Sequence, residues 1–133
     1  MRQKFKRSFN ELKNIVTMTE TVFREQGLEP SLRNVVDLAT EELFVNMVTY
    51  NTESSEDILI EMKPHAVGLE VSLTDYDVER FDPTRAANVD VDAPLNERAP
   101  GGLGLYLVLK MVDSIHYEYR NRQSKITFIV DRK

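Results

Sequence analysis

The sequence contains no cysteine and only two histidines. The lack of cysteine excludes disulfide bonds, cysteine-ligated zinc and thiol catalysis, and it suits the reducing environment of the cytoplasm. The two histidines, His65 and His116, lie far apart in the chain, and neither belongs to a metal-ligand pattern. The residues therefore indicate no metal centre built from cysteine or histidine.

Long apolar runs are also missing. No run approaches the ~20 residues that a membrane-spanning helix needs. The N-terminal residues MRQKFKRSFNELK contain no apolar core that could serve as a signal peptide. We therefore expect a cytoplasmic protein that makes no contact with a membrane.

Positive charge is in the minority. The 17 Lys and Arg residues face 22 Asp and Glu residues, for a net charge of −5 and a pI near 5.1. A nucleic-acid partner needs a basic face, so direct nucleic-acid binding is not expected. Residues 75–98 hold seven acidic residues against three arginines. This acidic stretch is either a solvated surface or a flexible segment beside a site.

The length of 133 residues predicts a single domain over residues 1–133. Residues 76–100 show no sustained period and contain three of the five prolines, as expected of a flexible lid. The expected elements are an edge strand over 2–9, a helix over 10–25 ended by Gly27, a helix from Ser31 as N-cap to Tyr50, strands over 57–63 and 67–74, a helix over 105–112 and a hairpin of 115–122 with 125–131. This order predicts an α/β two-layer sandwich with about three helices on one face of the sheet.

Polar residues lie along one edge of the second predicted helix. Glu42, Asn46 and Tyr50 are spaced four residues apart and so share a stripe beside the apolar face. A carboxylate one turn before a carboxamide can combine a general base with an oxygen ligand for Mg²⁺. The alternative is a set of solvated polar residues at the boundary of the core.

Asp75 continues the period-two pattern of the strand before it, so it is expected on the core-facing side of that strand's end. A buried carboxylate is costly unless a group donates a hydrogen bond to it. An amino group of a bound ligand would be such a donor. The alternative is an aspartate that begins a turn.

Three of the five glycines lie within residues 101–104, at the start of an apolar helical run. Glycines before a helix N-terminus can cradle phosphate groups. The run has neither the Lys-Ser/Thr of a P-loop nor the spacing of the dinucleotide fingerprint. A plain flexible loop is the competing interpretation.

These elements, in this order, resemble the ATP-binding Bergerat fold of the GHKL ATPase/kinase superfamily, and most of all the small anti-sigma-factor serine/threonine kinases of the RsbW type. The resemblance covers nearly the whole chain. Its most specific parts are residues 81–84 (FDPT), 94–98 (PLNER), 101–113 (GGLGLYLVLKMVD) and 117–120 (YEYR). It implies a mixed, mostly antiparallel sheet, with ATP and Mg²⁺ as cofactors.

The resemblance also implies a role for each matching residue. Glu42 would be the base that activates the attacking hydroxyl, and Asn46 would help to coordinate Mg²⁺. Asp75 would accept a hydrogen bond from the adenine amino group, with Thr127 assisting. The phosphates would be held by Gly101, Gly102, Leu103 and Gly104. Its partners would be an anti-anti-sigma (STAS) protein, which is phosphorylated, and a sigma factor; a homodimer is compatible with it.

Two residues depart from the family's pattern. Asp77 stands two residues after Asp75, where the family usually has glycine, and its side chain adds bulk and negative charge. Tyr50 stands where many relatives have a basic or imidazole side chain. One alternative is therefore a degenerate or non-catalytic module of the same fold that sequesters a partner. A second is a fragment of a phosphorelay-like or chaperone-like ATPase, although no segment for histidine phosphorylation or a dimer clamp is present.

Overall fold

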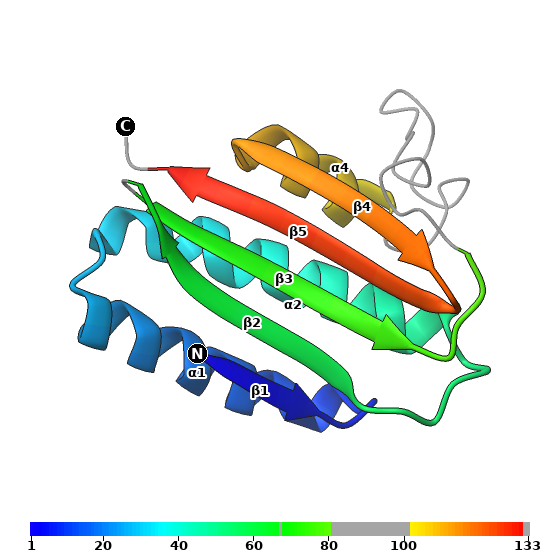
Figure 1. The fold of residues 1–133 in the computed structure, drawn as a ribbon. Coiled ribbons are helices and arrows are strands. Elements are labelled where there is room, and N and C mark those ends of the chain that lie inside the picture. Colours follow the sequence, from blue (N-terminus) through cyan, green and yellow to red (C-terminus); the bar gives the residue numbers. More distant parts are fainter. Residues whose placement is uncertain (67, 81–101, 132–133) are drawn as a thin grey trace.

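The computed structural model describes residues 1–66, 68–80 and 102–131, which form one sheet with helices on one face (Figure 1). The elements are β1 (Arg2–Phe5), η1 (Phe9–Glu11), α1 (Leu12–Gln26), η2 (Pro30–Leu32), α2 (Arg33–Tyr50), β2 (Ile58–His65), β3 (Gly68–Tyr76), α4 (Gly102–Met111), β4 (Ser114–Arg120) and β5 (Gln123–Asp131). The strand order is β1-β2-β3-β5-β4, and each neighbouring pair of described strands is antiparallel. The predicted two-layer sandwich is confirmed, with antiparallel pairing in place of a mixed sheet. The predicted lid from residue 81 onward, and Gly101, lie outside the described residues.

The ends of the first two long helices depend on backbone geometry. Gly27 ends α1 as predicted, in a left-handed conformation (φ 59°) with its N–H bonded to the carbonyl of Phe23. The prediction of Ser31 as an N-cap is wrong. The cap of η2 is Glu29, whose carbonyl accepts the N–H of Leu32 at 3.1 Å, so the chain enters α2 through a 3₁₀ turn with no side-chain cap.

No helix in the described ranges is long and apolar enough to cross a membrane.

The edge strand β1 is shorter than predicted. It ends at Phe5 because the N–H of Ser8 bonds to the carbonyl of Lys6 at 2.8 Å and closes a turn. Phe5 is buried in the core, which anchors the strand. Arg7 therefore lies on a tight turn between β1 and η1, beside the edge of the sheet.

The core lies between the sheet and the helices. On β3, Leu69, Val71 and Leu73 are fully buried. Across the sheet they pair in turn with Val130, Phe128 and Ile126 of β5, which are also buried. Each such side chain contributes roughly 1.5–3 kcal/mol through burial. The alternation of a strand places every second residue on this helix-covered face.

The third helix begins earlier than predicted. α4 starts at Gly102 instead of residue 105, so two of the glycines expected before the helix form its first turn. Val108 of this helix is fully buried, and the helix packs against α2. This packing brings Gly104 of α4 to Glu42 on the polar stripe of α2.

Candidate functional site

Three of the predicted segments meet on the helix side of the sheet. Helix α2 lies behind the sheet and packs against both β3 and α4 (Figure 1). Helix α2, which carries the polar stripe, therefore contacts the elements that hold Asp75 and the glycine segment.

Glu42 and Gly104 are in direct contact. Glu42 is half-buried on α2, and a Cβ atom placed on Gly104 would overlap its carboxylate. A larger residue at position 104 would therefore require the Glu42 carboxylate to move away from its present position. Burial raises the pKa of the Glu42 carboxyl, and the negative charge of the neighbouring Glu41 raises it further. A carboxylate with a raised pKa is better suited to accept a proton near neutral pH.

Asn46 follows Glu42 by one helical turn and is 7% exposed, whereas Tyr50, one turn further, is 39% exposed. The described residues contain no group of three or more His, Cys, Asp and Glu side chains that could hold a metal ion. Mg²⁺ in phosphoryl-transfer sites is commonly held by one or two protein oxygens together with phosphates and water. The amide oxygen of Asn46 and the nearby Glu42 carboxylate fit that smaller donor set.

Asp75 is fully buried near the end of β3, on the helix side, as the alternation predicted. Both of its carboxylate oxygens are engaged by the chain itself. Oδ1 forms an ion pair with the guanidinium of Arg7, and Oδ2 accepts a hydrogen bond from the side-chain amide of Asn51 at 2.6 Å. The donor that a buried carboxylate requires is therefore supplied internally.

Arg7 lies 68 residues before Asp75 in the sequence, and the fold brings the two side chains together. Its Nη1 also donates to the carbonyl of Met47, in the last turn of α2, at 3.4 Å. Burial lowers the pKa of Arg7, although the surrounding carboxylates of Glu53, Asp57 and Glu56 act in the opposite direction. The sequence reasoning missed both Arg7 and Asn51, because only the fold brings them to Asp75.

Asp77 has the left-handed backbone (φ 57°) that its glycine-like position requires. Its carboxylate bonds to Nε of Arg122 at 3.0 Å, and both side chains are more than half exposed. The N–H of Val78 also bonds to the carbonyl of Arg122, and the hydroxyl of Tyr119 donates to the carbonyl of Val78. The segment after β3 is thereby attached to the β4–β5 hairpin, with the charge of Asp77 balanced there.

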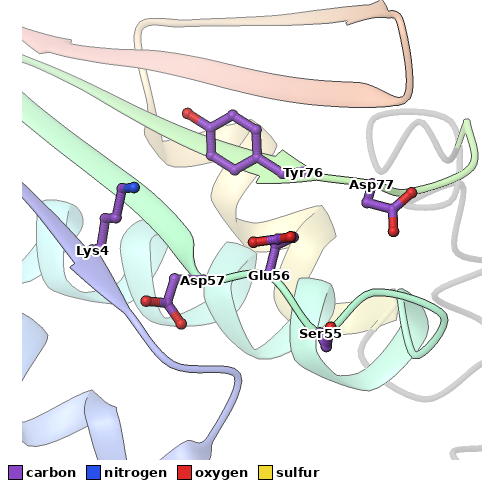
Figure 2. Close-up of a pocket in the computed structure, with 6 residues that line it drawn as sticks. All are labelled: Lys4, Ser55, Glu56, Asp57, Tyr76 and Asp77. Carbon is purple, nitrogen blue, oxygen red and sulfur yellow. The ribbon is translucent and has the colours of Figure 1, made fainter.

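A hollow of about 510 Å³ lies at this end of the sheet, and Figure 2 shows the side chains that line it. It is lined by Lys4, Ser55, Glu56, Asp57, Tyr76 and Asp77. Tyr76 and Lys4 alternate with the core-facing Asp75 and Phe5, so this hollow opens on the helix-free face of the sheet. Its three carboxylates do not favour phosphate groups.

Thr127 lies on the wrong face of the sheet to meet Asp75. Its neighbours on β5, Ile126 and Phe128, are buried towards the helices, so Thr127 projects to the helix-free side. The residue paired with Asp75 across the β3–β5 ladder is Ser124, which is 3% exposed. Counting in steps of two from Phe128 would have found Ser124 in the sequence.

The glycine segment is only partly described. Gly101 lies outside the described residues, while Gly102 and Leu103 are the first two residues of α4. The first amides of a helix have no partner within the helix, and they attract anions. The first turn of α4 thus presents such amides beside Glu42.

The chain matches the family model described as the histidine kinase-like ATPase domain over residues 5–130. Among solved structures, it is similar to a chain of the SiaB–SiaC complex from Pseudomonas aeruginosa. The identity is 17%, the TM-score is 0.69, and the alignment covers 98% of this chain and 88% of the other. None of the curated proteins matches the chain.

Proposed function

The chain belongs to the histidine kinase-like ATPase family, and from this premise we propose that it is a cytoplasmic, ATP-dependent protein kinase of the anti-sigma-factor type. In this proposal it binds a sigma factor and phosphorylates a serine or threonine of a STAS partner. The observation that carries the proposal is the contact of Glu42 with Gly104 at the start of α4. It places a carboxylate with a raised pKa beside helix amides that suit phosphates.

The proposed chemistry uses few side chains. Glu42 accepts the proton of the attacking hydroxyl, and its raised pKa makes it a stronger base than an exposed carboxylate. Asn46 supplies an oxygen ligand for Mg²⁺, which when bound offsets the negative charge of the ATP phosphates. In this proposal Asp75 accepts a hydrogen bond from adenine, and Ser124, its partner across the β3–β5 ladder, donates one. The amides of α4 hold the phosphates.

A protein partner is part of the proposal. The similar fold in the SiaB–SiaC complex belongs to a chain that is recorded together with another protein. That likeness concerns the fold, and the choice of a STAS protein and a sigma factor follows from the resemblance of the motifs. A pull-down with one purified STAS domain and one sigma factor would test each partner separately.

A second candidate function is partner sequestration without catalysis. The occupied carboxylate of Asp75 favours it, because Arg7 and Asn51 take the oxygens that adenine would use. Asp77 in place of glycine favours it as well. In this case the module would bind its partners equally well with and without ATP.

Phosphate transfer distinguishes the two candidates. The parent, Glu42→Gln and the matched control Glu41→Gln are incubated with labelled ATP, Mg²⁺ and a STAS domain. Glu41 is exposed and adjacent to Glu42 on the same helix. We expect transfer by the parent and by Glu41→Gln, and a loss of about 100-fold or more in Glu42→Gln, as is typical when a general base is removed. Equal transfer by all three proteins would refute the assigned base.

A further inference from the structure

The guanidinium of Arg7 occupies the carboxylate that the proposed nucleotide site needs. Asp75 is 0% exposed, and each of its oxygens already has a partner from the chain. We propose that Arg7 is a built-in competitor of the nucleotide, which holds Asp75 until the amino group of a bound base takes its place. This inference rests on the proposed function and concerns the regulation of the same site.

The competition follows from the chemistry of the two donors. A guanidinium and the exocyclic amine of adenine both present N–H groups to a carboxylate. Asp75 is 0% exposed, so a donor from outside can reach its carboxylate only if a side chain that covers it moves aside. Adenine binding to Asp75 therefore requires Arg7 or Asn51 to move.

Arg7 is the donor that can leave. Asn51 is the C-cap of α2, where its N–H bonds to the carbonyl of Met47 at 3.0 Å, and it is 7% exposed. Arg7 lies on a surface turn, its side chain is 12% exposed, and its Nε has no hydrogen-bond partner among the described residues. A rotation of one long side chain moves its guanidinium to solvent and leaves the turn unchanged.

The neighbourhood offers the released side chain a favourable position. Glu53, Glu56 and Asp57 belong to the loop between α2 and β2, and all three stabilise the positive charge of Arg7. Glu56 and Asp57 also line the hollow on the helix-free face. Release of Arg7 therefore exchanges one carboxylate partner for others nearby, which keeps the exchange reversible.

The first test compares the affinity for Mg-ATP of the parent, Arg7→Met and Arg2→Met. Methionine keeps the apolar length of the side chain and removes its donors. The control Arg2 is an exposed residue of β1, the strand that precedes the turn with Arg7. We expect Arg7→Met to bind ATP about tenfold more tightly, the order of one hydrogen bond to a charged group, and Arg2→Met to equal the parent. Tripolyphosphate, which has no base, should bind equally to all three proteins.

The second test uses the unaltered protein, so it does not depend on the folding of a variant. The side-chain N–H signals of Arg7 are followed by NMR during titration with ATP, with Arg33, which pairs with Asp37, as the internal reference. We expect the Arg7 signals alone to shift or to exchange faster with water. Unchanged Arg7 signals at saturation, or equal ATP affinity of parent and Arg7→Met, would overturn the inference and leave the proposed function intact. If neither folded protein binds ATP at millimolar concentration, both are overturned.

Discussion

Two aspartate–arginine pairs near the end of β3 provide a sharp comparison. Asp75 is fully buried and pairs with Arg7, whereas Asp77 is exposed and pairs with Arg122. The two aspartates are separated by one residue, so Asp75→Asn and Asp77→Asn make the same chemical change in different surroundings. We expect the first substitution to destabilise the fold and the second to have little effect.

The magnitude for Asp75→Asn follows from its burial. Removal of one partner from a buried ion pair typically costs about 3–5 kcal/mol. Arg7 retains 12% exposure and can turn towards water, and the new carboxamide can still accept a hydrogen bond from Asn51. We therefore expect a loss of about 2–3 kcal/mol, which for a chain of this length lowers Tm by roughly 7–11 °C. Asp77→Asn loses a solvent-screened pair, and asparagine tolerates the left-handed backbone.

Urea denaturation of the two variants measures this difference. The slope of the unfolding free energy against urea concentration should be the same in both variants. An unchanged slope shows that the substitution alters the free energy of unfolding but leaves the surface exposed on unfolding the same. The double variant Arg7→Met with Asp75→Asn then isolates the coupling between the two side chains. If Asp75→Asn were as stable as Asp77→Asn, the buried pair would not exist in solution, and the reasoning on Asp75 would be refuted.

The remaining predictions concern the base and the adenine end. Burial raises the pKa of Glu42, so its protonated form stabilises the fold at low pH and this contribution is lost as pH rises through the raised pKa. In urea denaturation, the free energy of unfolding of Glu42→Gln should therefore exceed that of the parent by more at pH 7 than at pH 4. The same comparison for Glu41→Gln should give a smaller change between the two pH values. Gly104→Ala would push the Glu42 carboxylate aside and lower phosphate transfer by about 100-fold. Circular dichroism should show that this variant is still folded. Ser124→Ala should weaken ATP binding about threefold to tenfold in calorimetry, the worth of one neutral hydrogen bond, whereas Thr127→Val on the opposite face should not. A larger loss of ATP affinity in Thr127→Val than in Ser124→Ala would contradict the assignment of Ser124 to the helix-covered face and of Thr127 to the opposite face.

Much of the fold could be predicted because local patterns dominate it. The alternation of Leu69, Val71 and Leu73 predicted a half-buried strand, and the structure shows these residues facing the helices. The left-handed Gly27 predicted the end of α1. The exact start of α2 was missed, because a proline-led 3₁₀ turn replaced a side-chain cap at Ser31.

The sequence by itself determined the order of strands and helices, the core-facing position of Asp75 and the shared stripe of Glu42 and Asn46, because these depend on periods of two and 3.6 residues. Only the tertiary structure decided what these side chains touch. The partners of Asp75 come from residues 7 and 51, and the β3–β5 register places Ser124 opposite it. Such contacts depend on strand pairing and helix packing between distant segments, which no local period specifies.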